Sequence, residues 1–324
     1  MKLFVTGGTG FFGKALLRYL RVRYEQQSDD LPELVVVLSR VPDKFLARHP
    51  EFANQDWLRF HCGDISVASS LPRNEHFTHV LHAAADSTDA SGLTPLQRYD
   101  QVVVGTRNVL EFAVATGARR FLLTSSGGVY GSQPPEVLAI PETYLGMPDP
   151  LNLNSVYGIA KRQAEHLCTL YRHQYGLATV IARCFAFVGP DLPLNAHFAI
   201  GNFIRDALQK DVVTVGGDGT PLRTYLFQDD LAEWLLTLLS EGKSGEAYNV
   251  GSDELVSIAE LAFLVRDILS PGKEVRILRS SSADQVRNRY VPDIRKARAE
   301  LNLMVNVALD EAILRTGQAS ARLL

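Results

Sequence analysis

The sequence predicts an α/β fold built on a doubly wound parallel sheet. Short apolar stretches, such as LVVVL at 34–38 and HVL at 79–81, alternate with helix-like segments along the first half of the chain. This alternation favours parallel strands whose two faces are covered by helices. The first predicted strand, 2–6, leads through the glycine-rich turn in VTGGTGFFGK into a helix expected near 12–25, which is how a Rossmann sheet begins.

The later elements continue the pattern. RRFLLTSS ends a strand at Ser126, and 155–176 has the apolar spacing of a helix, with Ser155 as the expected N-cap and Gly176 as the stop. The stretch between them, 131–154, is rich in proline and has no clear period, which predicts a long loop. After residue 189 the pattern loosens, until QDDLAEWLLTLL predicts another helix and EAYNVGS another strand.

The composition of the chain excludes several classes of protein. The 324 residues are 46% hydrophobic and carry a formal net charge of −3, so we expect a large core and no nucleic-acid partner. No apolar run approaches the ~20 residues that span a membrane. Three cysteines without a CxxC pair, and a first strand that leaves no room for a secretory signal, predict a cytoplasmic protein. No metal site is expected, because His79 and His82 point to opposite faces of a predicted strand and His166 and His173 are two helical turns apart, so neither pair can share a zinc ion.

The glycines of the first turn predict a dinucleotide site. Gly7, Gly10 and Gly13 have the spacing GxxGxxG between a strand and a helix. Glycine lets backbone N–H groups approach a pyrophosphate, and the helix N-terminus adds partial positive charge there. Phe11 and Phe12, beside these glycines, are expected to contact the cofactor as well. A tight turn without a ligand is the alternative, but the position between the first strand and the first helix favours cofactor binding.

The end of the second strand bears on which dinucleotide binds. NAD sites usually have an acidic residue there for the ribose hydroxyls, whereas this chain has Ser39 and Arg40, and an arginine suits the 2′-phosphate of NADP. NADP is therefore the preferred cofactor, with NAD as the alternative. Further cofactor contacts are expected after the third and fourth strands, from Asp64, Ile65, Ala83, Ala84 and Ala85.

The stretch YGIAK predicts acid/base catalysis. Tyr157 and Lys161 are four residues apart and therefore lie on one face of the predicted helix. A phenol has a pKa near ~10, and a partly buried ammonium group beside it favours the ionised form. A tyrosine and a lysine at this spacing are more often structural when they occur alone. Here Ser126 ends a strand where its hydroxyl can hold the substrate oxygen beside Tyr157.

Together these motifs resemble the extended short-chain dehydrogenase/reductase superfamily, and within it the NAD(P)-dependent nucleotide-sugar epimerases, dehydratases and reductases. The matching stretches, in order, are VTGGTGFFG, HAAA, SSGGVYG, YGIAK, GPD, GGDGTPLRTYLFQDDLAE, YNVGS and YVPDIRKA. The resemblance implies that Tyr157 is the acid/base, that Lys161 orients it and the nicotinamide ribose, and that Ser126 polarises the substrate oxygen. It also implies a nucleotide-diphosphate sugar as the substrate and a homodimer as the assembly.

The resemblance extends to substrate contacts and domains. Arg223 in PLRTY resembles the arginine that grips the substrate diphosphate, Arg289 is expected to do likewise, and Ser87 to touch the sugar. Residues 1–185 with 224–251 are expected to form the dinucleotide-binding domain. Residues 186–223 with 252–324 are expected to form a smaller, interleaved C-terminal domain for the nucleotide sugar.

Departures from the family pattern narrow the reaction. The 4,6-dehydratases have an Asp-Glu pair directly after the Ser or Thr of the triad, whereas this chain has Gly127 and Gly128, which disfavours a dehydratase. Ala186 stands where many epimerases have asparagine, so one expected contact with the substrate or cofactor is missing and the identity of the sugar stays open. We expect an epimerase or a 4-ketoreductase that passes a hydride between the nicotinamide and a sugar carbon. A non-catalytic, dinucleotide-sensing regulatory protein on the same fold is the alternative from another class.

Overall fold

The computed structural model describes residues 1–85, 92–280 and 287–322, and the chain divides into two compact units. Unit 1 comprises Met1–Gly131, Met147–Cys184 and Ala232–Tyr248. Unit 2 comprises Ser132–Gly146, Phe185–Leu231 and Asn249–Leu324. Each unit is therefore assembled from three separate stretches of sequence.

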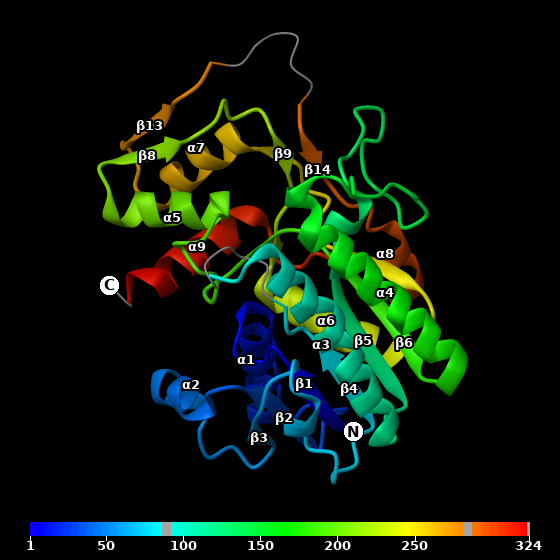
Figure 1. Cartoon of the computed structure of the whole chain (residues 1–324). Helices are drawn as coiled ribbons and strands as arrows, with labels where there is room; N and C mark the ends of the chain where they lie inside the picture. The colour runs from blue at the N-terminus through cyan, green and yellow to red at the C-terminus, as the bar shows by residue number, and fades with distance from the viewer. Residues whose placement is uncertain (86–91, 281–286, 323–324) are drawn as a thin grey trace. The chain divides into compact units, whose positions relative to one another are not determined.

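A parallel sheet organises unit 1 (Figure 1). Its strands are β1 (Lys2–Thr6), β2 (Leu34–Ser39), β3 (Leu58–Cys62), β4 (His79–His82), β5 (Arg120–Ser126), β6 (Ala178–Cys184) and β11 (Ala247–Val250). They form a seven-stranded sheet in the order β11-β6-β5-β4-β1-β2-β3, and β1 to β6 pair in parallel. The order reverses at β1, which lies between β2 and β4, so this sheet is doubly wound, as the sequence predicted.

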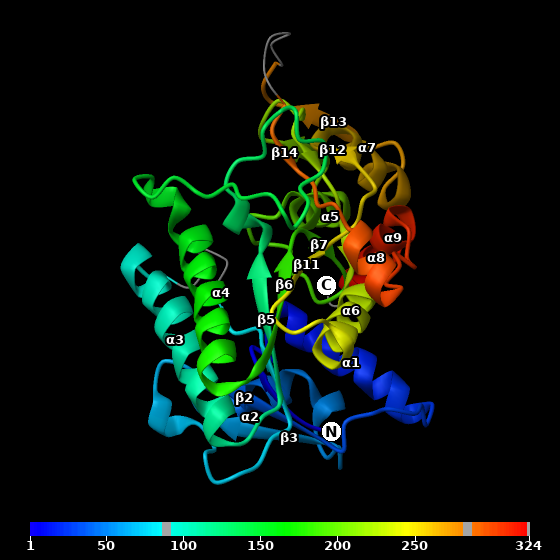
Figure 2. The ribbon, with the colours of Figure 1, turned by 90° about the vertical axis from the view of Figure 1, so that its right-hand side faces the viewer.

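Helices cover both faces of this sheet. They are α1 (Phe11–Glu25), α2 (Pro42–Arg48), α3 (Pro95–Ala115) and α4 (Val156–Tyr175), with 3₁₀ turns η1 (Pro50–Phe52), η2 (Ala68–Ser70), η4 (Gly127–Tyr130) and η5 (Leu153–Ser155). The helix α6 (Gln228–Glu241) begins in unit 2 and continues in unit 1. Figure 2 shows α3 and α4 side by side on one face of the sheet and α1 on the other.

Apolar side chains from the strands, α3 and α4 make a core cluster in unit 1. The ring of Phe4 in β1 lies 4.4 Å from that of Phe112 in α3 and 5.2 Å from that of Phe77, measured between centroids. All three side chains are almost completely buried. Strands that are buried on both faces require continuous apolar runs such as LVVVL, which is why these runs predicted the sheet.

Both predicted ends of α4 agree with the structure, because Ser155 and Gly176 flank the helix Val156–Tyr175. Gly176 has φ +70° and closes the helix in the left-handed conformation, as expected of a glycine stop. Ser155 occupies the predicted N-cap position, but its side chain makes no capping hydrogen bond. The preceding turn η5 is capped instead by Asn152, whose Oδ1 accepts a hydrogen bond of 3.0 Å from the backbone nitrogen of Asn154.

Unit 2 contains short strands and five helical segments, counted over its described residues and with the start of α6 included. Its strands are β7 (Phe187–Val188), β8 (Val212–Val215), β9 (Leu222–Arg223), β10 (Leu226–Phe227), β12 (Val256–Ser257), β13 (Glu274–Ile277) and β14 (Arg289–Tyr290). They form the small sheets β10-β7, β12-β9-β14 and β13-β8. The other helices are α5 (Ala199–Gln209), α7 (Ile258–Leu269), α8 (Arg295–Leu301) and α9 (Leu309–Ala321), and α5, α7 and α9 pack against one another.

Part of the long loop that the sequence placed in the first domain belongs to unit 2. The backbone nitrogen of Ile140 donates to the carbonyl of Val291 at 2.9 Å, and the Ile140 carbonyl accepts from the backbone nitrogen of Asp293 at 2.9 Å. The Asn249 side chain donates to the same carbonyl at 2.8 Å. These hydrogen bonds join residues more than 100 positions apart, so the proline-rich composition of the loop could not indicate them.

Candidate functional site

The turn after β1 is closed against the end of β4. Gly7 has φ +74°, and a Cβ atom there would lie 2.5 Å from the carbonyl carbon and oxygen of Ala83. The carbonyl of Gly7 accepts a hydrogen bond of 3.0 Å from the backbone nitrogen of Gly10. Both the backbone conformation and the close approach of β4 therefore require glycine at position 7.

Gly13 and Gly10 differ in what their surroundings require. A Cβ atom at Gly13 would lie 2.1 Å from the Cα atom of Gly8, so glycine lets α1 pack directly on the turn. A Cβ atom at Gly10 would meet, among the described residues, one atom within 4 Å, the Gly7 carbonyl oxygen at 3.4 Å. Gly10 is also exposed. Packing does not explain a glycine at position 10, which leaves the backbone there open to a ligand.

The first turn of α1 has the polarity that an anion prefers. It begins with Phe11 and Phe12, which are partly buried and whose ring centroids are 5.8 Å apart. It contains no acidic residue, and the N-cap, Gly10, offers no side chain to the backbone N–H groups. The partial positive charge of the helix N-terminus is therefore not offset by a carboxylate of the first turn.

A buried histidine joins the ends of β1 and β4 to α3. Nδ1 of His82 lies 2.7 Å from Oγ1 of Thr6, and Nε2 lies 3.1 Å from Oγ1 of Thr106. Burial, with a smaller effect of the Lys161 charge, lowers the pKa of His82 to about 3, so the ring is neutral. Oγ1 of Thr6 also accepts from the backbone nitrogen of Ala84 at 3.2 Å. Sequence reasoning missed this role, because both partners of His82 lie on other elements.

Residues after β2 and β3 lie at the same edge of the sheet. Ser39 is buried, and its Oγ accepts a hydrogen bond of 3.3 Å from the backbone nitrogen of Val41. Arg40 is exposed and forms no ion pair within the described part of the chain. After β3, Oδ1 of Asp64 accepts from the backbone nitrogen of Ser66 at 2.8 Å, which fixes the carboxylate locally. Arg40 is thus the side chain here that is available to an anionic ligand.

The remaining predicted cofactor residues have partners of their own. Ile65 is buried against Gly105 of α3, and its carbonyl accepts from the Asn108 side chain at 2.8 Å. Packing therefore accounts for Ile65 without a ligand. Directly after β4 come three partly buried residues, Ala83, Ala84 and Ala85. Apart from Tyr157 and Lys161 on α4, the predicted cofactor residues lie at or after the carboxyl ends of β1 to β4, where open α/β sheets bind ligands.

The three predicted catalytic residues come from β5 and α4. Lys161 is 2% exposed, and its Nζ donates a hydrogen bond of 2.8 Å to the carbonyl oxygen of Thr124. The same Nζ lies 5.7 Å from the centroid of the Tyr157 ring. Ser126 is buried at the end of β5, and its Oγ accepts from the backbone nitrogen of Gly128 at 3.1 Å. Burial lowers the pKa of Lys161 to about 8, so the ammonium form is readily lost in alkaline solution.

Sequence reasoning missed one acidic residue on the same face of α4. Glu165 follows Lys161 by four residues, as Lys161 follows Tyr157, and its side chain is buried against β5 and β6. The repeated spacing was a signal for a shared face. The partners of Glu165 come from distant strands, so only the structure identifies them.

The two arginines predicted for the diphosphate lie in the sheet β12-β9-β14 of unit 2. The register pairs Arg223 with Tyr290 and Leu222 with Arg289. Paired residues share a face of a sheet and successive residues alternate, so Arg223 and Arg289 project from opposite faces. Burial lowers the pKa of Arg223, and its Nη1 donates to the Leu222 carbonyl at 2.8 Å. The register thus separates two side chains that the sequence analysis placed in one site, and Ser87 lies outside the described residues.

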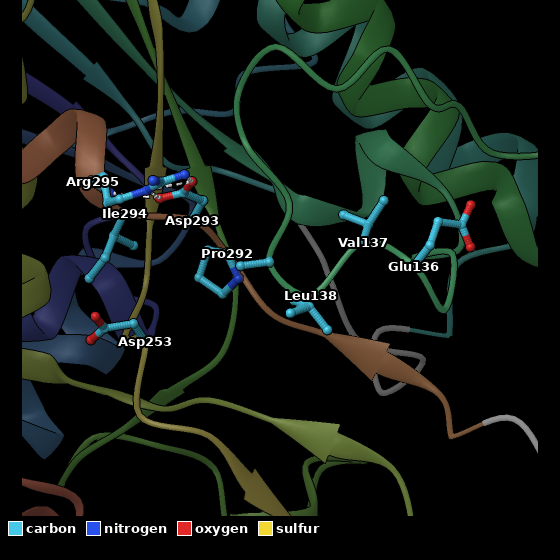
Figure 3. A pocket seen from close by; sticks show the side chains of 9 residues that line it. Glu136, Val137, Leu138, Asp253, Pro292, Asp293, Ile294 and Arg295 are labelled. Carbon is cyan, nitrogen blue, oxygen red and sulfur yellow. Dashed lines mark hydrogen bonds and ion pairs between the residues drawn. The ribbon is translucent and has the colours of Figure 1, made fainter.

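A cavity of about 490 Å³ in unit 2 does not contain the predicted residues (Figure 3). It is lined by residues 136–139, Asp253 and residues 292–295. Figure 3 shows the side chains of Asp293 and Arg295 pointing toward one another, with 2.6 Å between Oδ2 and Nη2. Asp253 is likewise paired with Arg298 at 2.6 Å. Since these carboxylates are neutralised by arginines, we assign no catalytic role to the cavity.

Two properties of the described residues bear on metal binding and on membrane insertion. No cluster of three or more His, Cys, Asp or Glu side chains in residues 1–85, 92–280 and 287–322 is arranged to hold a metal ion. In the same part of the chain, every helix is too short or too polar to cross a membrane.

Comparison with known proteins places the chain in a family. UDP-glucuronic acid decarboxylase 4 of Arabidopsis thaliana is 31% identical over 316 residues, which cover 97% of this chain and 67% of that protein. The crystal structure of the dTDP-glucose 4,6-dehydratase DesIV from Streptomyces venezuelae with NAD and TYD bound is 27% identical, with a TM-score of 0.84 over 99% of this chain and 97% of that one. The UDP-glucose 4-epimerase of Thermotoga maritima, 24% identical, shares the fold over 100% of this chain and 99% of that one, with a TM-score of 0.82.

The family assignment rests on most of the chain. Residues 3–251 match the model of the NAD dependent epimerase/dehydratase family. This stretch includes the glycine turn, the end of β5 and the Tyr157–Lys161 pair. The chain therefore belongs to the NAD dependent epimerase/dehydratase family and is an enzyme of the extended short-chain dehydrogenase/reductase type.

Proposed function

We propose that this enzyme transfers a hydride between a nicotinamide dinucleotide and a carbon of a nucleotide-linked sugar, as an epimerase or a 4-ketoreductase. The observation that carries the proposal is the arrangement at the end of β5. Lys161 is buried between the Thr124 carbonyl and the Tyr157 ring, and Ser126 ends the same strand. A bound nicotinamide supplies or accepts the hydride, a step for which the side chains have no equivalent.

In this proposal the side chains handle the proton. Tyr157 takes a proton from the sugar hydroxyl during oxidation and returns it during reduction. The Lys161 ammonium group stabilises the phenolate, and its hydrogen bond to Thr124 fixes its position. Ser126 holds the reacting oxygen beside Tyr157. Each group acts in both directions, which an epimerase needs because it oxidises and then reduces the same sugar.

We propose unit 1 as the dinucleotide-binding domain and unit 2 as the nucleotide-sugar domain. Support for the first comes from the open backbone at Gly10 and from an α1 N-terminus without acidic residues. Support for the second comes from Arg223, whose guanidinium group is partly buried, because a partly desolvated cation attracts a diphosphate more strongly. The face opposite Arg223 carries Arg289, so we propose Arg223 as the principal diphosphate contact.

We propose NADP as the preferred cofactor, with NAD as the alternative. The support is the pair Ser39 and Arg40 after β2. The buried Ser39 hydroxyl already accepts a backbone hydrogen bond, whereas the Arg40 side chain is exposed at the edge of the sheet. A carboxylate at either position would repel a 2′-phosphate, and the chain has none there.

We also propose a homodimer in the cytoplasm. The helices α3 and α4 expose the apolar side chains Leu96, Val104 and Leu170, which a second subunit would cover. No disulfide joins the three cysteines, Cys62, Cys168 and Cys184, which suits a reducing compartment. Light scattering of the purified protein tests the dimer.

Decarboxylation of a nucleotide-linked uronic acid is the second candidate reaction. The similarity to UDP-glucuronic acid decarboxylase 4 over 97% of the chain favours it. The same three residues serve this chemistry, because oxidation at C4 turns the C6 carboxylate into a β-keto acid that loses carbon dioxide readily. Dehydration is less well supported, since Gly127 and Gly128 provide no acid/base side chain after Ser126.

One experiment separates these reactions. The purified enzyme is incubated with UDP-glucose, UDP-galactose, UDP-glucuronic acid, dTDP-glucose and a dTDP-4-keto sugar, with NAD, NADP or NADPH. Products are followed by mass spectrometry and NMR. An unchanged mass with an inverted carbon identifies an epimerase, a gain of two hydrogens a reductase, and a loss of carbon dioxide a decarboxylase. Loss of water alone, or no turnover with any sugar, contradicts the proposal.

A further inference from the structure

Four polar side chains form a network beside Lys161 in unit 1. Oε1 of Glu165 accepts a hydrogen bond of 2.6 Å from Oγ of Ser125. Arg183 of β6 donates its Nε to Oε1 at 3.1 Å and its Nη2 to Oε2 at 2.8 Å. Nη1 of Arg183 donates to the Tyr130 hydroxyl at 2.9 Å, and the guanidinium carbon lies 4.8 Å from that ring. The network thus joins α4 to β5, β6 and η4.

The network holds both sides of the strand end that carries Ser126. Ser125 directly precedes Ser126, and Tyr130 ends the turn η4 that follows it. The other end of the network, Glu165, lies one helical turn beyond Lys161 on α4. Displacing Glu165 would therefore change the position of α4 relative to Ser126, on which the proposed proton transfer depends.

Several titratable side chains lie around Lys161, and Glu165 is the one among them that carries a negative charge. His82 in β4 is neutral, because burial lowers its pKa to about 3. Burial raises the pKa of the Cys184 thiol in β6 to about 12 and also raises that of the Cys168 thiol in α4, so both stay protonated at neutral pH. Among the described groups that interact electrostatically with Lys161, this leaves Glu165 to favour its ammonium form.

Arg183 partly offsets the negative charge of Glu165 that acts on Lys161. Although burial alone disfavours its charge, hydrogen bonds and the proximity of Glu165 and Tyr130 raise the pKa of Arg183, so the guanidinium is always charged. The carboxylate therefore acts on Lys161 from within an ion pair. Changing either partner alters the charge that Lys161 experiences, and the two changes act in opposite directions.

Stability alone is a weak reason for such a network. The side chains of Arg183 and Glu165 are 17% and 10% exposed. Buried ion pairs are often replaced by apolar residues without loss of stability, because removing two charges from water costs about as much as their attraction returns. An effect of the ion pair on the neighbouring Lys161 explains its position better than stability does.

We propose that Glu165, held by Arg183 and Ser125, is a positioning residue that keeps the Lys161 ammonium group charged and fixes the strand end that carries Ser126. This inference rests on the proposed function insofar as Lys161 serves Tyr157. The charge effect itself can be measured without cofactor, substrate or turnover.

The test measures the titration of Lys161 through stability. The free energy of unfolding is determined by urea denaturation from pH 6.5 to 10.5 for the full chain and for Lys161→Met, and their difference is plotted against pH. The folded state holds fewer protons than the unfolded state above the folded pKa of Lys161, so the full chain gains stability relative to Lys161→Met from that pH upward. The onset of this gain is expected near pH 8.

Two variants are expected to move the onset in opposite directions. Glu165→Gln, compared with Glu165→Gln/Lys161→Met, removes the anion and lowers the onset by about 1 pH unit. Arg183→Gln, compared in the same way, leaves the carboxylate uncompensated and raises the onset. Glu165→Asp retains the charge and restores the onset toward pH 8. The matched control is Glu75→Gln, which removes the same charge from an exposed ion pair with Arg59 and leaves the onset unchanged.

An onset that is the same in the parent, Glu165→Gln and Arg183→Gln overturns the proposal and makes the network a packing element. If Glu165→Gln does not fold, Arg183→Gln alone decides, because an upward shift supports the charge effect and an unmoved onset contradicts it. Kinetics separate this failure from failure of the proposed function. Unchanged turnover in Tyr157→Phe rejects the proposed function, whatever the onset does.

Discussion

Nζ of Lys161 donates its 2.8 Å hydrogen bond to the carbonyl oxygen of Thr124, two residues before Ser126. The cation from the helix is thereby fixed to the strand that ends in the proposed oxygen-binding residue. An ammonium group buried with one backbone acceptor is poorly solvated, which is why its charge is sensitive to its neighbours and to pH. The fixed position of the Lys161 ammonium group and the sensitivity of its charge to pH can both be tested.

Tyr157→Phe is expected to lower turnover by about 10²- to 10⁴-fold, because it removes the proton carrier and keeps the ring. Dinucleotide binding should persist, since the glycine turn belongs to other elements. The free energy of unfolding should change by no more than about 2 kcal/mol. Turnover is measured on the sugar that the substrate panel identifies, and near-normal turnover would make Tyr157 a packing residue.

The pH dependence of stability should reveal Lys161. Burial lowers its pKa from 10.5 to about 8 in the folded chain, so below pH 8 the folded state bears the full cost of a buried charge. Between pH 8 and 10.5 the unfolded state binds more protons, and stability relative to Lys161→Met should rise, by on the order of 3 kcal/mol in total. Urea denaturation across this range measures the rise, and a flat difference contradicts burial of the charged amine.

Two glycine substitutions should separate folding from cofactor binding. Gly7→Ala places a Cβ atom 2.5 Å from the Ala83 backbone at φ +74°, so it should lower the melting temperature strongly. The Cβ atom of Gly10→Ala would meet little protein, so the melting temperature of the apoprotein should stay within about 2 °C of the parent, which corresponds to about 1 kcal/mol for a chain of this length. It should nevertheless weaken dinucleotide binding at least tenfold. Calorimetry with NAD and NADP measures the affinity, and unchanged binding in Gly10→Ala would place the pyrophosphate elsewhere.

Arg40→Asp should reverse the dinucleotide preference. The exposed guanidinium is replaced by a carboxylate that repels a 2′-phosphate and accepts hydrogen bonds from ribose hydroxyls. Dissociation constants for NADPH and NADH are compared in parent and variant. Tighter binding of NADH than of NADPH by the parent protein would reject Arg40 as a 2′-phosphate contact.

Arg223→Ala should raise the Michaelis constant for the nucleotide sugar far more than it lowers turnover, because a diphosphate contact binds the ground state and the transition state alike. Arg289→Ala is the matched control, since it projects from the opposite face of the same small sheet. Steady-state kinetics on both variants decide the matter. If both variants raise the Michaelis constant equally, Arg223 is not the principal diphosphate contact.

The sequence was most informative where function and local structure use the same few residues. The glycine turn after β1 and the Tyr157–Lys161 pair on α4 were predicted because their spacing is fixed within one turn or one helix. Ser155 lies at the predicted N-cap of α4, but the turn η5, capped by Asn152, leads directly into the helix, and the Ser155 side chain makes no capping hydrogen bond. Local sequence therefore predicted where α4 begins and ends, but not which side chain makes the hydrogen bond that caps the turn leading into it.

Contacts between distant residues could not be predicted. The pairing of Glu165 with Arg183 depends on α4 lying against β6, and the separation of Arg223 from Arg289 depends on the register of strands with two residues each. The place of Ile140 in unit 2 depends on hydrogen bonds to residues near 291. Each of these follows from tertiary structure, for which the spacing of residues along the chain carries no signal.

The interleaving of the two units has a consequence for how such an enzyme can change its substrate. The backbone passes between the units after Gly131, Gly146, Cys184, Leu231 and Tyr248. No single cut of the gene yields either unit intact, and exchange of one unit with a relative would require simultaneous replacement of three separate gene segments. A single crossover therefore cannot exchange one whole unit, so substitutions and loop changes within a unit are the simpler route to a new specificity.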